Sequence, residues 1–196
     1  MTTIQHGSKL TLAEYRALEP VDEGVWELAD GELFEMPPPS YDHQNLIDYL
    51  VRMINNFMDT TDPLLGTIVS GIGVVLSETR APTPDAVYLK AEKGHLIRGS
   101  FVEGVPDLVV EVLSSDRSRD LVLKRDWYHE AGVPEYWIMD PAADSLSVLE
   151  WTESGYFLRA VFGRGDVLTT STIPGFELQM NMLFDNRARS LPVQRS

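Results

Sequence analysis

The sequence contains no cysteine among its 196 residues. Disulfide bonds and thiolate metal sites are therefore excluded. No apolar run approaches the roughly 18 to 20 residues that span a bilayer, so we expect no membrane segment. The start of the chain, Met1 to Gly7, lacks the basic and apolar regions of a secretory signal peptide. These absences lead us to expect a cytoplasmic protein.

Basic residues are scarce as well. Sixteen Lys and Arg stand against thirty Asp and Glu, which gives a formal net charge of −14. Proteins that bind duplex DNA usually carry a basic footprint, because neutralising phosphates supplies much of their affinity. The charge therefore argues against tight non-specific binding to DNA. It does not exclude a nuclease, because a metal ion supplies local positive charge and basic residues can cluster in space.

The length and the 43% hydrophobic content suit one domain with a substantial core. We expect this single domain to cover residues 10–183. Residues 184–196 are expected to form a mobile tail, because the chain holds three arginines and little apolar content from Asn186 onward.

The stretch from Pro106 to Ser114 predicts a strand that is buried on both faces, because the residues between them are almost continuously apolar. Side chains alternate across a strand, so Asp107 and Glu111 share one face. Glu111 should therefore be buried. A buried carboxylate is costly unless a cation, hydrogen bonds or a metal ion compensates it, which makes Glu111 the strongest functional signal in the sequence.

A helix is predicted from Arg117 to Ala131, ended by Gly132 and Pro134. Helical periodicity places Lys124 near the middle of its apolar stripe, so Lys124 should face the preceding strand. An inward-facing ammonium needs an anionic partner, and Glu111 is the nearest candidate. A purely structural ion pair, or a lysine that snorkels to the rim, stays open as an alternative. The N-cap is expected at Ser114, Ser115 or Asp116.

A short strand is predicted from Thr83 to Leu89, and Asp85 lies near its start. Two carboxylates on neighbouring strands together with one lysine are typical of metal-dependent hydrolysis. Mg²⁺ takes oxygen ligands from one or two carboxylates, with substrate phosphate and water completing its shell. An adjacent lysine can orient or activate the attacking water.

Several segments together resemble the Uma-type restriction endonuclease family, within the PD-(D/E)XK nuclease superfamily. The resemblance covers roughly residues 10–183. It rests on Pro84-Asp85, the strand 107–114, Asp120 with Lys124 and Tyr128, and the segment 131–141, with further similarity at 27–37 and at His43-Gln44. In the wider superfamily the lysine stands two residues after the acid. That position is Leu113 here, and the resemblance implies that the lysine has moved to the helix at Lys124.

The resemblance implies that Asp85 and Glu111 hold Mg²⁺ or Mn²⁺ together with the carbonyl of Val112, and that Lys124 positions the attacking water. The resemblance would make His43 a supporting residue beside the metal, although a simple hydrogen bond in the core is the alternative that its sequence context favours. Asp107 could support the site or serve a turn. DNA is the implied substrate, and a homodimer would match the two-fold symmetry of a duplex site.

The expected fold is α/β, with a restriction endonuclease-like mixed β-sheet flanked by helices. A helix from Thr11 to Leu18 and a hairpin over 25–36 precede it, and a C-terminal antiparallel β meander follows it. The other predicted elements are a helix over 41–58, a strand over 66–76 interrupted by Gly71 and Gly73, a loop over 92–99, a strand over 134–140, meander strands at 145–151, 156–162 and 166–172, and a packed segment at 176–180. Glu27, Glu32 and Glu35 are interpreted as the solvated face of the hairpin, with one of them as a possible site residue.

Two other classes of function remain open. The first is a catalytically inactive nuclease-fold protein that binds nucleic acid or regulates, which Leu113 and the net charge favour. The second is a subunit whose main task is assembly, for which the meander offers surface.

Overall fold

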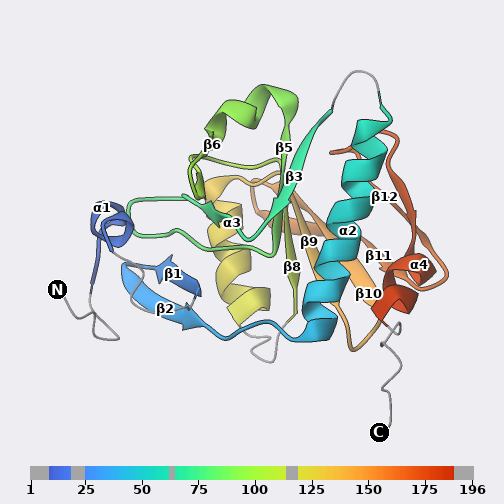
Figure 1. The fold of residues 1–196 in the computed structure, drawn as a ribbon, viewed down its shortest axis with the longest axis horizontal. Helices are drawn as coiled ribbons and strands as arrows, with labels where there is room; N and C mark the ends of the chain where they lie inside the picture. Colours follow the sequence, from blue (N-terminus) through green and yellow to red (C-terminus); the bar gives the residue numbers. More distant parts are fainter. Residues whose placement is uncertain (1–8, 19–24, 62–64, 114–118, 188–196) are drawn as a thin grey trace, which may run out of the picture.

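The computed structural model describes residues 9–18, 25–61, 65–113 and 119–187. Its centre is a six-stranded mixed sheet with the strand order β11-β10-β9-β8-β5-β3 (Figure 1). The middle strand β8 (Leu108–Val112) runs parallel to β9 (Glu135–Asp140) and antiparallel to β5 (Ala86–Lys90). Every residue of β8 is buried, so the predicted mixed sheet and its doubly covered strand are confirmed.

Helices cover both faces of this sheet. On one face, α2 (Tyr41–Asp59) and α4 (Met180–Arg187) pack over the even-numbered residues of β8. On the other face, α3 (Arg125–Ala131) packs through Tyr128 over Val109 and its neighbours. Figure 1 shows the N-terminal hairpin and α1 at one end of the molecule and α2 with α4 at the other. Within the described ranges, no helix has the length and apolarity needed to cross a bilayer.

The N-terminal elements form as local sequence signals predict. Thr11 and Glu14 make both bonds of a capping box on α1 (Leu12–Arg16). Strands β1 (Val25–Ala29) and β2 (Glu32–Met36) form a hairpin whose turn residues Asp30 and Gly31 have φ angles of 50° and 81°. At the start of α2, Ser40 caps the helix by accepting a hydrogen bond from the backbone of His43.

The glycines of the predicted strand 66–76 divide it into two strands. Gly71 has a φ of 66° and separates β3 (Gly66–Ser70) from β4 (Gly73–Val74). A Cβ atom at Gly73 would lie 2.7 Å from the ring of Phe101, so this close approach requires glycine. Strand β4 leaves the main sheet and joins a separate small sheet with β6 (Ile97–Arg98) and β7 (Phe101–Val102).

Some boundaries differ from the prediction. The expected loop over 92–99 holds a 3₁₀ turn, η1 (Ala91–Leu96), followed by β6. The expected helix over 117–131 begins in the described part as a π-helical turn, η2 (Arg119–Lys124), and continues as α3. The three candidate N-caps at 114–116 lie outside the described residues.

The C-terminal third differs in one pairing. Strands β10 (Ser145–Thr152) and β11 (Gly155–Gly163) form the expected antiparallel pair. The third run, β12 (Val167–Thr169), pairs instead with β13 (Glu177–Gln179) in a sheet of its own. Helix α4 continues to Arg187 with Phe184 fully buried, so the packed structure extends beyond residue 183. Residues 188–196 of the expected tail lie outside the described part.

A buried carboxylate ties this C-terminal segment to the sheet. Glu135, at the start of β9, is only 2% exposed. It accepts hydrogen bonds from the Trp137 indole at 2.5 Å, the Thr170 hydroxyl at 2.7 Å and the Thr172 hydroxyl at 2.6 Å. All three donors are neutral, so hydrogen bonding compensates for the buried charge.

We predict that Thr172→Val lowers the free energy of unfolding by about 1 to 3 kcal/mol, because the buried carboxylate of Glu135 loses a donor. Denaturant unfolding measures the change. Thr169→Val, at an exposed position of β12, is the matched control and should stay within about 0.5 kcal/mol of the parent. Equal stabilities of the two variants would contradict this role for Glu135.

Candidate active site

Glu111 lies at the centre of a buried polar cluster. It is 3% exposed on the face of β8 that α3 covers. Its Oε1 atom accepts hydrogen bonds from Lys124 Nζ at 3.0 Å and from the Tyr128 hydroxyl at 2.7 Å. Lys124 is itself only 1% exposed. The predicted inward orientation of Lys124 and its pairing with Glu111 are therefore confirmed.

Helical geometry brings the two donors to the same atom. Lys124 and Tyr128 are four residues apart along η2 and α3, and residues at that spacing lie on one helix face. The helix ends at Gly132, whose φ of 79° is a left-handed conformation that suits glycine. Lys124 and Tyr128 therefore reach Glu111 from a single rigid segment.

Glu27 completes the cluster from the N-terminal hairpin. Its Oε1 atom lies 3.1 Å from Lys124 Nζ and accepts the backbone N–H of Thr83 at 2.9 Å. The side chain is fully buried, so the interpretation of Glu27 as part of the solvated face is wrong. The signal for burial was present in the sequence, because Glu27 is a lone acid in an apolar run, as Glu111 is in β8.

Asp85 lies where β5 begins, and both of its oxygens have partners. Oδ1 is 2.8 Å from His43 Nε2, and Oδ2 accepts the backbone N–H of Val112 at 2.6 Å. Strand β5 starts one residue after Asp85, so this side chain substitutes for a strand partner of Val112. The structure thus brings His43, at the start of α2, to the carboxylate of Asp85.

The strand register relates Asp85 to Glu111. Ala86 pairs with Val110, and one further step of that antiparallel register places Asp85 opposite Glu111. The N–H and C=O of one strand residue point toward the same neighbouring strand. Because the N–H of Val112 meets Asp85, the carbonyl of Val112 is directed to the same side.

Asp107 lies apart from this cluster. It is four residues before Glu111, about 13 Å along a strand that rises about 3.3 Å per residue. Its Oδ2 atom accepts the backbone N–H of Lys90 at 2.9 Å, and its Oδ1 atom lies 3.0 Å from Lys93 Nζ. These contacts give Asp107 a structural role at the start of β8.

The composition of the site fits a hard divalent cation. Glu27 and Glu111 share the ammonium of Lys124, and the register of β5 and β8 places Asp85 opposite Glu111. The excess of negative charge and the oxygen donors are what Mg²⁺ and Mn²⁺ bind. Across the described ranges no group of three or more His, Asp and Glu side chains is placed to hold a metal ion. A metal here would need the backbone carbonyl as well as the carboxylates.

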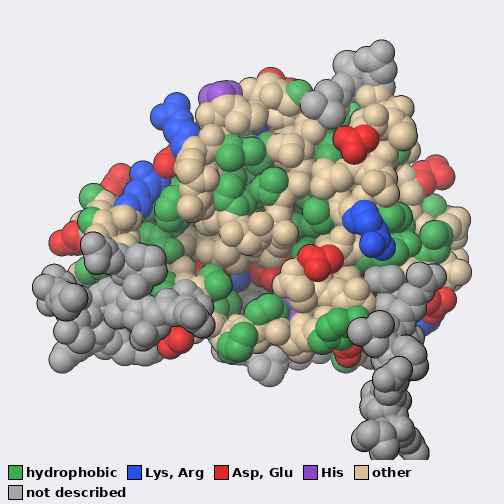
Figure 2. Space-filling view, viewed as in Figure 1, with side chains coloured by type: hydrophobic (Ala, Val, Ile, Leu, Met, Phe, Trp, Pro, Cys, Tyr) green, Lys and Arg blue, Asp and Glu red, His purple; other side chains and the backbone are tan. Residues whose placement is uncertain are grey.

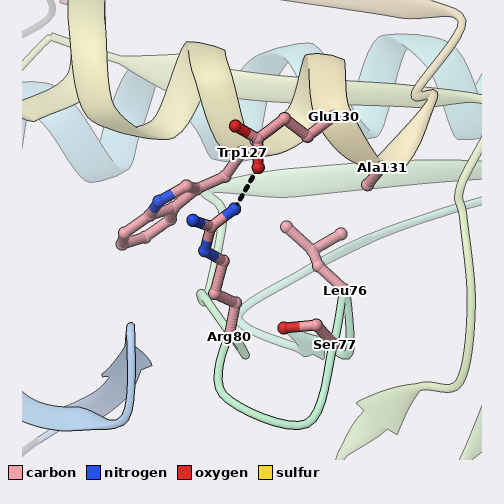
Figure 3. Close-up of a pocket in the computed structure, with 6 residues that line it drawn as sticks. All are labelled: Leu76, Ser77, Arg80, Trp127, Glu130 and Ala131. Carbon is pink, nitrogen blue, oxygen red and sulfur yellow. Dashed lines mark hydrogen bonds and ion pairs between the residues drawn. The ribbon is translucent and has the colours of Figure 1, made fainter.

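A shallow hollow lies next to the cluster, between α3 and the 76–80 segment (Figure 3). Arg80 fills much of its wall, with its guanidinium 5.6 Å from the centre of the Trp127 ring and ion pairs to Asp30 and Glu130. At about 170 Å³ the hollow is smaller than typical ligand pockets of about 300 Å³ or more. Arg80 thus links the hairpin turn to α3.

Tyr128 is held as a neutral donor. Complete burial, and then the charge of Glu111, raise the pKa of its hydroxyl well above the usual value near 10. Tyr128 therefore keeps its proton, and its hydrogen bond to Glu111, throughout the ordinary pH range.

Comparison with known proteins adds a family and a fold. A family model, Uma2, described as "Putative restriction endonuclease", matches residues 12–181. A crystal structure described as that of a putative nuclease belonging to DUF820, from Anabaena variabilis, superposes with a TM-score of 0.74 at 19% sequence identity. The match covers 91% of this chain and 99% of that chain, so the two share a fold. No curated protein matches the chain.

The raised pKa of Tyr128 predicts a loss of stability in alkali. The unfolded chain releases this proton near pH 10 and the folded chain only at higher pH. The stabilisation is therefore complete below about pH 10 and is lost as pH rises toward the folded pKa, by up to about 1.4 kcal/mol per pH unit. Tyr128→Phe should show a shallower loss than the parent in urea unfolding between pH 9 and about 11. Identical slopes would contradict the assignment.

Proposed function

Because the chain belongs to the Uma2 restriction endonuclease family, we propose that it is a metal-dependent endonuclease that hydrolyses phosphodiester bonds in DNA. The observation that carries the proposal is the cluster at the ends of β5 and β8. There Asp85 and Glu111 come from adjacent antiparallel strands, and Lys124 is buried against Glu111.

The carboxylates of Asp85 and Glu111, with the carbonyl of Val112, would hold Mg²⁺ or Mn²⁺. When bound, the ion polarises the scissile phosphate and stabilises the charge that develops on it. The direction of the Val112 carbonyl supports this ligand set, because that carbonyl points to the side on which Asp85 lies.

Side chains of the protein hold the attacking water and the two carboxylates in place. Lys124 keeps one position because two buried carboxylates hold its ammonium, and from there it donates a hydrogen bond that places the attacking water. Tyr128 fixes the carboxylate of Glu111 through its hydroxyl. His43 fixes the carboxylate of Asp85 in the same way. Each acid is thus held in a defined orientation before substrate arrives.

The charge of the protein affects how strongly it could bind a negatively charged substrate. The chain carries a net charge of −14, and on the face shown in Figure 2 the described Lys and Arg side chains are scattered without a continuous patch. Phosphate neutralisation by this face of the protein is therefore weak. A bound cation would supply positive charge at the scissile phosphate, so catalysis would depend more on the metal than in a strongly basic nuclease.

A second candidate is an inactive nuclease-fold protein that binds nucleic acid or regulates. One observation favours it: Leu113 occupies the position two residues after Glu111 and packs in the core beside α3. Cation binding separates the two candidates, because an inactive protein has no requirement for a metal ion.

We predict that the protein cleaves DNA with Mg²⁺ or Mn²⁺ and that Lys124→Met abolishes this cleavage. Without metal, the variant leaves Glu27 and Glu111 buried without their cation, at a cost of about 3 to 5 kcal/mol. Added metal should recover much of that stability. Gel assays on varied DNA substrates and thermal unfolding with and without Mg²⁺ measure both effects.

Lys93→Met is the matched control, because Lys93 pairs with Asp107 at the other end of β8. It should cut at the parental rate. A Lys124→Met protein that also cuts at the parental rate would remove Lys124 from the mechanism. A parent protein that neither binds Mg²⁺ nor cuts nucleic acid would favour the inactive candidate.

We also propose that two copies associate through the sheet edge to cut both strands of a duplex. Strand β11 is an edge strand and exposes Phe157, Leu158 and Val161 at 62%, 50% and 53%. Residues 155–163 contain no acid, although the whole chain is strongly acidic. Edge strands can pair with an identical strand about a two-fold axis, and this acid-free segment avoids repulsion between carboxylates of the two copies.

Light scattering should then give the mass of a dimer for the parent protein. The double variant Leu158→Lys with Val161→Lys should give the mass of a monomer, because two charges are placed on the paired edge. Val25→Lys, at a 52% exposed residue of the hairpin, is the control and should stay dimeric. A parent protein that is monomeric across working concentrations would contradict the proposal.

A further inference from the structure

Lys124 divides its charge between two carboxylates. Its Nζ atom lies 3.0 Å from Glu111 Oε1 and 3.1 Å from Glu27 Oε1, which are nearly equal distances. All three side chains are almost completely buried, so water screens these interactions little. The three residues together carry one unit of negative charge.

The second carboxylate changes the electrostatics of the first. With Glu111 as its sole partner, the ammonium would offset the charge of that carboxylate at close range. A neutral pair of this kind attracts a divalent cation weakly. With Glu27 competing for the same ammonium, Glu111 keeps more of its negative charge available to a cation.

We propose that Glu27 is a positioning residue that draws Lys124 partly away from Glu111 and thereby keeps Glu111 able to bind a divalent cation. The inference rests on the proposed metal-dependent function and deepens it. Glu27 acts through Lys124 and need not touch the metal or the substrate.

The hairpin is anchored so that Glu27 can do this. The backbones of Leu28 and Ala81 are hydrogen-bonded in both directions, and the backbone N–H of Thr83 donates to Glu27 itself. Thr83 is two residues before Asp85, so the segment that fixes Glu27 also leads into the metal-binding carboxylate. Arg80 adds ion pairs from the same segment to Asp30 in the hairpin and to Glu130 in α3.

The test measures the affinity of the 196-residue chain for Mn²⁺ by calorimetric titration. Glu27→Gln keeps the size of the side chain and an acceptor for Thr83 but removes the charge. Its affinity for Mn²⁺ should fall by about tenfold or more, which is about 1.4 kcal/mol. Glu135→Gln is the control, because it removes one buried charge on the opposite face. Its affinity should stay within about twofold of the parent, because Glu135 pairs with Leu108, three residues along β8 from Glu111, and lies on the other face of the sheet.

A second comparison separates positioning from direct attraction and also serves if Glu27→Gln does not fold. Adding Glu27→Gln to Lys124→Met should lower Mn²⁺ affinity by less than about threefold, because the ammonium through which Glu27 acts is gone. A larger loss would show that Glu27 acts by its own charge and would overturn the inference.

The remaining outcomes are also decisive. If the parent binds Mn²⁺ and Glu27→Gln binds it equally well, the inference fails while the proposed function stands. If the parent does not bind Mn²⁺ at all, the proposed metal-dependent function fails and the inference fails with it.

Discussion

The ammonium of Lys124, held between Glu27 and Glu111, is the interaction on which the rest of the site depends. It joins three parts of the chain: the N-terminal hairpin, the central strand β8 and the segment before α3. Removing the ammonium alone would leave two buried carboxylates without their cation, which costs several kcal/mol. The cluster therefore couples the position of the hairpin to the geometry of the central strand.

The end of strand pairing in the sheet positions Asp85, the other carboxylate of the candidate site. Strand β5 begins at Ala86, so the next N–H along β8, that of Val112, meets the side chain of Asp85 instead of another backbone. Two more residues of pairing would have placed Pro84 opposite Val112, where a backbone carbonyl could accept that N–H. The same early end of pairing leaves room for His43 to reach Asp85 from α2. The end of backbone pairing at Ala86 thus leaves Asp85 in a position to serve as a ligand.

The charge of buried carboxylates is compensated differently on the two faces of the sheet. On the α2 side, Glu135 is surrounded by neutral hydroxyl and indole donors, which compensate one charge and hold a loop in place. On the α3 side, Glu27 and Glu111 share one ammonium, and the excess negative charge is suited to a cation. Charge balance, more than burial, distinguishes a structural acid from a candidate functional one in this protein.

Local periodicity in the sequence was enough to determine the buried strand of Glu111, the inward face of Lys124 and the Asp30-Gly31 hairpin turn, because each depends on neighbours within one or two turns of chain. Only the tertiary structure decided that Glu27 meets Lys124, that His43 meets Asp85 and that β12 pairs with β13. The first two of these contacts join residues far apart in the chain, where alternation within a strand says which face is buried but not what covers it. The hairpin could turn Glu27 to solvent or to the core, and the packing of the hairpin against residues 81–83 selects the core.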